Sequence, residues 1–285
     1  MDYQVLIYAV ASLGALGLFF GFALAFVAKK FHVEVDPRME EVVEALPGAN
    51  CGGCGYPGCN AYAEAVTKGA AVNLCPPGGA ETAEAVGKIM GVEAGAGAKL
   101  MAVVRCQGDH AHAKNAYDYY GVPTCSAADK IDNGHKLCAD GCLGFGDCVR
   151  SCGFDALFMS EGGLPVVIED KCVACGACVT ACPRGIMELI PADEPVYLAC
   201  VNRDRGKAVK DACTVGCIGC SICARDKGNP NGGIVMDGAL PVLSFDHEGH
   251  TFNDALKVCP AGCFVRRLPL DEKAVEEEKA EMAEA

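Results

Sequence analysis

An uninterrupted apolar run near the N-terminus is the first pattern in the chain. Positions 5–28 read VLIYAVASLGALGLFFGFALAFVA and contain no charged residue. About twenty apolar residues in a helix cross the roughly 30 Å hydrocarbon layer of a bilayer. The pattern predicts one membrane-spanning helix within an anchor segment, 1–30. A helix buried in a globular core is the alternative, but the rest of the chain offers no large core to cover it.

The charges at the two ends of this run predict its orientation. The chain starts MDYQ, without the basic stretch that precedes the shorter apolar core of a signal peptide. Lys29 and Lys30 follow the run instead. Basic residues stay on the cytoplasmic side, so we expect a single-pass protein of the cell (inner) membrane with everything after residue 30 in the cytoplasm. Cytoplasmic cysteines stay reduced, which favours metal binding over disulfides.

Helical and hairpin patterns follow the anchor. DPRMEEVVEAL at 36–46 predicts a short helix, with Asp36 as its N-cap and Pro37 at its first position. NAYAEAVTKG predicts a second helix directly after Cys59. LFMSEGGLPVVIE at 157–169 and IVMDGALPVLSF at 234–245 are each two extended apolar segments around a glycine-containing turn, as in a β-hairpin. The predicted fold class is α+β.

Cysteine spacing indicates an internal repeat, and each copy is followed by one of the two hairpins. The spacing x12, x3, x5 occurs twice, first at Cys125, Cys138, Cys142 and Cys148, then at Cys200, Cys213, Cys217 and Cys223. We expect two ferredoxin-like units. The expected organisation is an anchor at 1–30, a four-cysteine module at 31–80, a connector at 81–124, a two-cluster unit at 125–190, a degenerate one-cluster unit at 200–268 and an acidic tail at 269–285.

Composition narrows the function classes. The chain has 21 cysteines, no Trp and a formal net charge of −13. The acidic charge, without a basic stripe, argues against nucleic acid as a partner. An acidic surface suits a partner with a basic docking patch, although solubility alone explains it equally well. Phosphate-binding loops, dinucleotide-binding turns and nucleophile–base arrangements are absent from the sequence, so we expect no catalytic residue and no substrate-converting site.

The strongest motif is CVACGACVTACP at 172–183, which fits the iron–sulfur run C-x2-C-x2-C-x3-C-P. In two-cluster ferredoxins the last cysteine of each run ligates the other cluster. One predicted cluster therefore takes Cys152, Cys172, Cys175 and Cys178. The other takes Cys138, Cys142, Cys148 and Cys182, with Cys138 standing in because the usual middle position is Phe145. Structural zinc is the minor alternative.

Two further clusters are expected, which makes four [4Fe-4S] clusters in total. The N-terminal module supplies Cys51, Cys54, Cys59 and Cys75, whose spacing also suits a four-cysteine zinc site. The second unit supplies Cys217, Cys220, Cys223 and, as the crossed ligand of a Cys-Pro, Cys259. Lys227, Gly249, Phe252 and Ala255 stand where the unit's other cluster would need cysteines. That cluster is predicted to be lost as a whole.

Five cysteines remain without an assigned ligand role: Cys106, Cys125, Cys200, Cys213 and Cys263. Buried, inert thiols are one interpretation, and a further metal site is another. Cys125 and Cys200 occupy equivalent positions of the spacing repeat, which suggests a shared structural role. Cys213 is also a reserve ligand in the second unit, because its equivalent, Cys138, is used in the first.

The motifs together resemble a known family. GANCGGCGYPGCNAYAEAV, VVRCQG, CLGFGDCVRSC, CVACGACVTACP and CTVGCIGCSIC, behind a membrane anchor, resemble the longer form of the B subunit of the Rnf ion-translocating ferredoxin:NAD oxidoreductase complex. The resemblance covers nearly the whole chain. The chain departs from that form in its last unit, where one cluster's ligands are missing.

The resemblance implies a role in a redox-driven ion translocase. The protein would accept electrons from reduced ferredoxin on the cytoplasmic side. It would relay them to the other membrane subunits, where transfer to NAD is coupled to movement of Na+ or H+. The module nearest the anchor is the expected exit site. A soluble polyferredoxin-like carrier and a non-redox zinc scaffold are the alternative functions; membrane fractionation tests the first and iron analysis the second.

Overall fold

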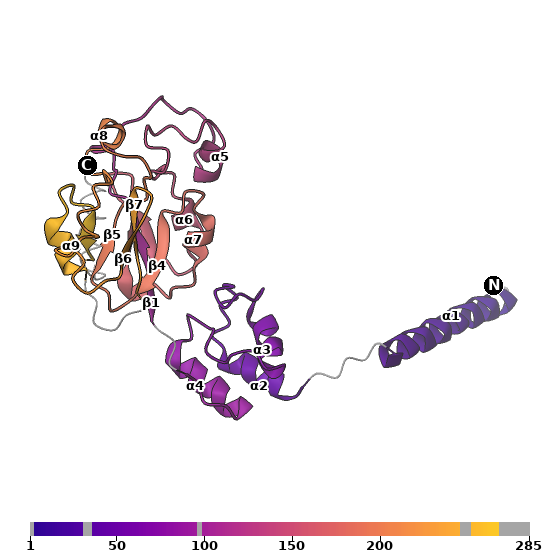
Figure 1. Ribbon diagram of the computed structural model, residues 1–285. Coiled ribbons are helices and arrows are strands. Elements are labelled where there is room, and N and C mark those ends of the chain that lie inside the picture. The colour runs from indigo at the N-terminus through magenta and orange to yellow at the C-terminus, as the bar shows by residue number, and fades with distance from the viewer. Residues whose placement is uncertain (1–2, 31–35, 96–98, 246–251, 268–285) are drawn as a thin grey trace.

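The computed structural model describes residues 3–30, 36–95, 99–245 and 252–267. A long helix, α1 (Tyr3–Lys30), stands apart from two folded parts (Figure 1). Its stretch Val10–Lys30 has a mean hydropathy of 2.2 and is not buried by any described part of the chain. By length and composition α1 is a candidate membrane-spanning helix, and its exposure argues against the alternative of a core helix. The expected acidic tail, 269–285, and residues 1–2 of the anchor lie outside the described residues.

Three helices form the N-terminal module: α2 (Arg38–Ala45), α3 (Cys59–Thr67) and α4 (Gly79–Met90). Val42, Tyr62, Val66 and Val86 are at most 1% exposed and make its core. α2 begins at Arg38 with Pro37 as its N-cap, one residue later than the sequence predicted, and the Asp36 carboxylate accepts the Arg38 N–H at 2.9 Å. The packing of α4 on α2 means that the module extends past residue 80, into the segment expected to be a connector.

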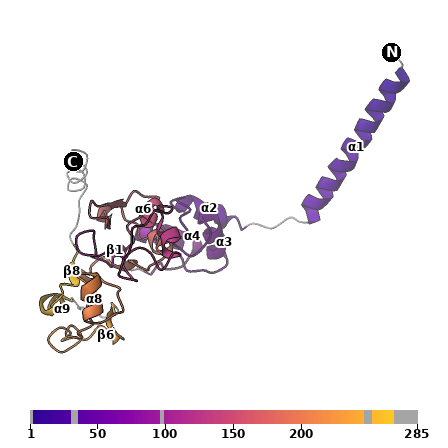
Figure 2. The same cartoon turned by 90° about the horizontal axis from the view of Figure 1, so that it is seen from above.

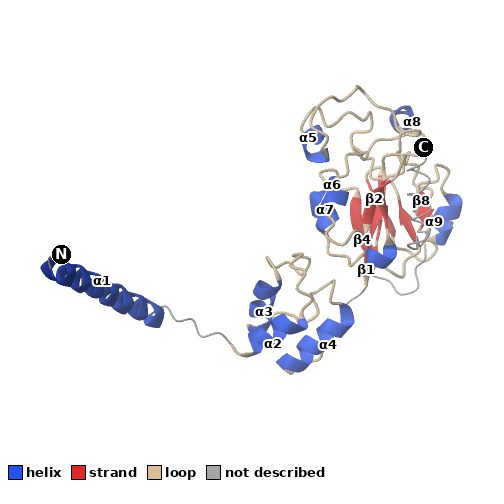
Figure 3. Ribbon diagram, turned by 180° about the vertical axis from the view of Figure 1, so that it is seen from behind, coloured by secondary structure: helices blue, strands red, loops and turns tan. Residues whose placement is uncertain are grey.

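The strands lie in the larger folded part of the chain, away from α1 (Figure 3), and this part consists of two segments with the same order of strands. The first, here called repeat 1, pairs β1 (Leu100–Val104) with β4 (Met187–Pro191) in antiparallel register, Leu100 opposite Pro191. Between them lies the predicted hairpin of β2 (Leu157–Met159) and β3 (Pro165–Val167). Its short helices are α5 (Cys125–Asp129), α6 (Asp147–Arg150), the 3₁₀ turn η1 (Glu169–Lys171) and α7 (Ala177–Ala181).

The second segment, repeat 2, has the same plan. It pairs β5 (Val196–Leu198) with β8 (Phe264–Arg266) around the predicted hairpin of β6 (Ile234–Asp237) and β7 (Leu240–Leu243). Its helices are α8 (Lys207–Ala212) and α9 (Asn253–Val258). The apolar cores of both repeats are small and include buried cysteines. The stability of each core therefore depends on what its thiols contact.

The strand pairing aligns the repeats differently from the cysteine spacing. After β1, the Arg105 N–H donates to the Ile186 carbonyl at 2.7 Å; after β5, the Ala199 N–H donates to the Cys263 carbonyl at 2.8 Å. The next residues, Cys106 and Cys200, are therefore structural equivalents. The expected equivalence of Cys125 with Cys200 does not hold, because repeat 1 begins at β1 and carries α5 within a longer connection between Cys106 and Cys138.

One short segment, 112–116, joins the two repeats, which lie side by side in Figure 2. On one side the Lys114 N–H donates to the Ala212 carbonyl at 2.9 Å, and Ala113 forms a β-bridge with Cys213. On the other side the Leu137 N–H donates to the Lys114 carbonyl at 2.8 Å. The chain just before Cys138 and the chain at Cys213 are thus held on opposite edges of the same segment.

Candidate metal centres

All 21 cysteines are free thiols, and each lines at least one of five cavities. Four cavities are each lined by four or five cysteines that lie in one part of the fold. The fifth lies between the two repeats. Throughout the described ranges, no three His, Cys, Asp or Glu side chains converge closely enough to hold a single metal ion. The cysteines surround spaces instead of converging on one point, which suits a group larger than an ion.

The module cavity is lined by the four cysteines that the sequence groups there, Cys51, Cys54, Cys59 and Cys75. α3 begins at Cys59, whose N–H donates to the Asn50 side-chain oxygen at 2.9 Å. Gly58, just before it, has φ of 118°, and a Cβ there would lie 2.9 Å from the same oxygen. Only glycine combines this backbone with so close an approach. The loop and the start of α3 therefore fix the cysteines around the cavity.

The α7 cavity is lined by Cys152, Cys172, Cys175 and Cys178, the set that the crossed ferredoxin scheme predicts. Its Cys175 lies against the N-terminal module. A Cβ on Gly53 would sit 2.8 Å from the Cys175 carbonyl oxygen and 3.0 Å from its Cα. The loop between Cys51 and Cys54 is consequently in direct contact with the loop that carries Cys175.

The α5 cavity differs from the expectation. It is lined by Cys125, Cys142, Cys148 and Cys182. Cys138, which the sequence scheme grouped with the last three, does not line it and lies in the cavity between the repeats. Helix α5 brings Cys125 to the lining of this cavity. With five residues, α5 is too short to give a periodic pattern of apolar residues in the sequence.

Two carboxylates hold α5 in place. Asp147, the residue before Cys148, accepts the N–H groups of Cys125 and Ser126, each at 2.9 Å. At the other end of α5, the Asp129 carboxylate pairs with Arg184 at 2.5 Å, two residues past Cys182. Asp147 begins α6, which carries Cys148, and Arg184 follows Cys182, so the position of Cys125 is fixed relative to two cysteines that line the same cavity.

The second-repeat cavity is lined by Cys217, Cys220, Cys223 and Cys259, together with Cys263. The chain around Cys259 repeats the local geometry of Cys182. The N–H four residues on donates to the sulfur in both cases, Ile186 to Cys182 at 3.4 Å and Cys263 to Cys259 at 3.3 Å. The Cys-Pro of repeat 2 therefore has the same backbone environment as the complete motif of repeat 1.

Nothing in the described part of repeat 2 replaces the missing second set of cysteines. Phe252 is 4% exposed and Ala255 is fully buried, both within the apolar core of the repeat. Phe252 packs edge-on against Phe245, with ring centroids 5.7 Å apart. Lys227 is exposed, and Gly249 lies outside the described residues. Core side chains thus occupy two of the four positions where repeat 2 would need ligands.

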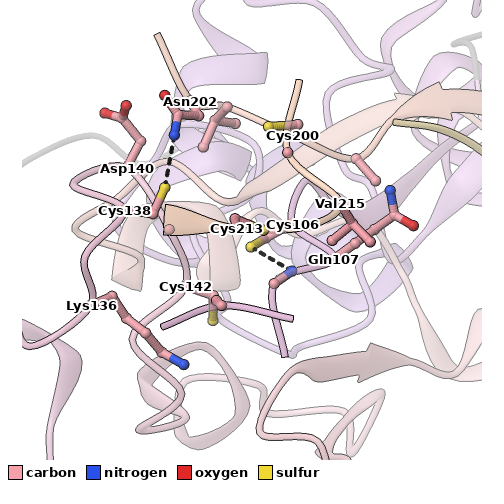
Figure 4. A pocket seen from close by; sticks show the side chains of 16 residues that line it. Cys106, Gln107, Lys136, Cys138, Asp140, Cys142, Cys200, Asn202, Cys213 and Val215 are labelled. Carbon is pink, nitrogen blue, oxygen red and sulfur yellow. Dashed lines mark hydrogen bonds between the residues drawn. The ribbon is translucent and has the colours of Figure 1, made fainter. Parts of the chain in front are cut away.

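The junction cavity lies between the repeats and is the one that sequence reasoning did not assemble (Figure 4). Five cysteines line it: Cys106, Cys138, Cys142, Cys200 and Cys213. Cys142 also lines the α5 cavity. The signal in the sequence was weak, because these residues come from separate segments and share no run of fixed spacing.

Burial sets the protonation of the metal-free thiols. It raises the pKa of Cys142, Cys148 and Cys200 to about 12. In the second-repeat cavity, the neighbouring Cys263 thiol, whose single proton can be donated to one sulfur at a time, lowers the pKa of Cys217 to about 7 and that of Cys259 to about 5. Thiolate is the metal-binding form, so ligation at the buried thiols must displace their protons.

The donor sets fit iron–sulfur clusters. Each cavity offers at least four thiols, and backbone or amide N–H groups point at several of the sulfurs, as they do around protein-bound clusters. Bound there, a cluster would supply one-electron redox chemistry.

Family profiles agree with two of these regions. Residues 46–77 match the family described as “Putative Fe-S cluster”, which spans the module cavity. Residues 165–188 match the “4Fe-4S binding domain” family, which covers most of the α7 cavity and Cys182. The fold and the sites define an iron–sulfur protein of mixed helix and strand with one candidate membrane helix.

Comparison with whole proteins gives the family. The chain is 45% identical over 224 residues to the B subunit of the ion-translocating oxidoreductase complex of Methanosarcina acetivorans, covering 78% of this chain and 85% of the relative. It is 49% identical over 209 residues to the B subunit of the Na(+)-translocating ferredoxin:NAD(+) oxidoreductase complex of Acetobacterium woodii, covering 73% of this chain. It is 43% identical over 204 residues to the proton-translocating counterpart of Clostridium ljungdahlii, covering 71% of this chain and 72% of the relative.

The chain belongs to the family of B subunits of ion-translocating oxidoreductase (Rnf) complexes. It matches 63% of the length of the Acetobacterium relative.

Proposed function

We propose that this chain is the membrane-anchored electron-transfer subunit of an ion-pumping ferredoxin:NAD oxidoreductase complex. It accepts electrons from reduced ferredoxin and relays them through [4Fe-4S] clusters toward the other membrane subunits. The family membership and the two matched iron–sulfur regions support this function. The chain's own contribution is to hold redox groups in series, and no substrate-converting site is assigned to it.

The observation that carries the proposal is the contact between successive cysteine cavities. The loop that carries Cys51 and Cys54 of the module cavity contacts Cys175 of the α7 cavity through Gly53. The α7 and α5 cavities are neighbours through α6 and α7, which pack together and carry Cys148 and Cys178. A protein that used its cysteines only as separate structural staples would have no need for this continuity.

The proposed ligand sets follow the cavities, with one change from the sequence scheme. They are Cys51, Cys54, Cys59 and Cys75; Cys152, Cys172, Cys175 and Cys178; Cys125, Cys142, Cys148 and Cys182; and Cys217, Cys220, Cys223 and Cys259. Cys125 replaces Cys138 in the third set because it lines that cavity and is anchored there by Asp147. Cys263 is left out of the fourth set as a hydrogen-bond donor, because its thiol donates to the Val215 carbonyl at 3.4 Å.

The direction of the relay follows from the position of the anchor. The N-terminal module is the folded part nearest to α1 in the chain, so we assign it the exit toward the membrane partners. Repeats 1 and 2 form the entry side, facing ferredoxin in the cytoplasm. Lys29 and Lys30 at the end of α1 support the cytoplasmic placement by the positive-inside rule.

Electron transfer in the assembled complex tests the function. Membranes containing the whole complex receive reduced ferredoxin, and NADH formation is followed with the wild-type chain and with Cys54→Ala. The variant should bind ferredoxin and accept electrons in repeats 1 and 2, yet NADH formation should stop. Unchanged NADH formation would contradict the relay order, and a chain that contains zinc in place of iron would contradict the function itself.

A further inference from the structure

We propose that the junction cavity is a fifth cluster site, in which Cys106, Cys138, Cys200 and Cys213 hold an iron–sulfur cluster between the two repeats. The inference rests on the proposed function only in taking the other cavities as cluster sites. The fifth site goes beyond the proposed function, because it gives a ligand role to four cysteines that the four-cluster scheme leaves out.

The four cysteines are two pairs of structural equivalents. Cys106 and Cys200 each follow the first strand of their repeat by two residues. Cys138 and Cys213 each precede a glycine by three residues, and a Cβ on either glycine, Gly141 or Gly216, would lie within 3.6 Å of that cysteine's side chain. Each repeat therefore contributes the same two positions to one cavity. Such a paired arrangement is unexpected for unrelated inert thiols.

The sulfurs of one residue from each repeat both lie beside Gly108. A Cβ built on Gly108 would lie 3.5 Å from the Cys213 sulfur and 3.6 Å from the Cys106 sulfur. The empty space of the cavity, its mouth included, is about 420 Å³, against about 310 to 370 Å³ for the other four. The junction cavity is thus at least as roomy as those with a complete ligand set.

Hydrogen-bond donors point at three of the four sulfurs, as Figure 4 shows for two of them. The Asn202 amide donates to Cys138 at 3.1 Å, the Gly108 N–H to Cys106 at 3.4 Å and the Cys217 N–H to Cys200 at 3.3 Å. N–H groups directed at sulfur stabilise the thiolates of a cluster. Lys136 also lines the cavity and is only 7% exposed, so its ammonium group is placed to offset negative charge there.

Cys142 is the fifth cysteine of this cavity, and we assign it to the neighbouring one. The α5 cavity has four cysteines only if Cys142 is among them. Its presence on both linings makes it the direct contact between the junction cavity and the α5 cavity. On the other side, the N–H of Cys217, which lines the second-repeat cavity, donates to Cys200. The junction site is therefore the link that joins repeat 2 to the series of cavities in repeat 1.

Metal and sulfide analysis of the full chain, purified without oxygen, tests the fifth site. With five clusters the chain should contain about 20 Fe and about 20 acid-labile sulfides; with four it should contain about 16 of each. Cys213→Ala should lose about four Fe and keep the Mössbauer signals of the others. Val201→Ala, which alters the lining of the same cavity without removing a thiol, should lose none.

The outcomes separate this inference from the proposed function. About 16 Fe in the wild-type chain, or iron unchanged in Cys213→Ala, would overturn the fifth site while leaving the relay proposal in place. About one Zn per chain alongside about 16 Fe would also overturn it, since the site would then hold a zinc ion. A wild-type chain without iron would overturn the proposed function instead. The wild-type count decides the question even if Cys213→Ala fails to fold.

Discussion

The contact between Gly53 and Cys175 gives a direct way to interrupt the proposed relay without removing a ligand. In Gly53→Ala the new Cβ would lie 2.8 Å from the Cys175 carbonyl oxygen, 3.0 Å from its Cα and 3.2 Å from the Pro76 ring. The first two are backbone atoms, so the loops must separate by roughly half an ångström to reach ordinary contact. Overpacking of this kind costs about 1–3 kcal/mol, which weakens docking of the module by about 5- to 150-fold.

The assay is stopped-flow reduction of the full chain by reduced ferredoxin, followed by the bleaching of cluster absorbance. In the wild-type chain all clusters should bleach in one connected process. In Gly53→Ala a slow phase with the amplitude of one cluster should appear, while iron content stays the same. Gly153→Ala is the matched control, because it lies beside Cys152 of the same α7 cavity and its Cβ would meet nothing within 4 Å. Identical bleaching in Gly53→Ala and wild type would refute the route through Cys175.

Four further predictions address the ligands, the core and the anchor. Cys125→Ala should lose about four Fe, and an unchanged iron content would contradict the assignment of Cys125 as a ligand in the α5 cavity. Cys259→Ala should also lose about four Fe, whereas Cys263→Ala should lose none; equal losses from both would contradict the assignment of Cys263 as a hydrogen-bond donor. Removing all iron with a chelator should abolish the cooperative thermal transition of the repeats, because cysteines make up much of their cores; an unchanged melting temperature would contradict this. Deleting residues 1–30 should move the protein from the membrane pellet to the supernatant, and a truncated chain that still pellets alone would contradict anchoring by α1.

Features with a local signal could be predicted from the sequence. The apolar run 5–28 falls within α1, and both glycine-centred hairpin patterns form hairpins. The module's cysteines surround one cavity because they lie in a single short loop-and-helix segment. The Cys259 assignment was reached by counting positions, and the structure gives that cysteine the same backbone surroundings as Cys182.

Features that depend on distant contacts could not be predicted. β1 pairs with β4 across more than eighty residues, so segment 100–104 looked like part of a connector. α5 is too short for a periodic pattern; its start is capped by Thr124, whose side chain accepts the Ala127 N–H at 3.2 Å, and by Asp147 from another helix. Without those contacts, the spacing of Cys125 suggested equivalence with Cys200 and left Cys138 as the apparent ligand.

In the proposed function, this chain accepts electrons from ferredoxin into a connected set of clusters. An anaerobic titration of the purified full-length chain with reduced ferredoxin, read by electron paramagnetic resonance, tests it most directly. We expect uptake of about one electron per cluster, hence at least about four per chain, with the signals of reduced [4Fe-4S] clusters. A chain that takes up no electrons from reduced ferredoxin, or that contains zinc in these cavities, would contradict it.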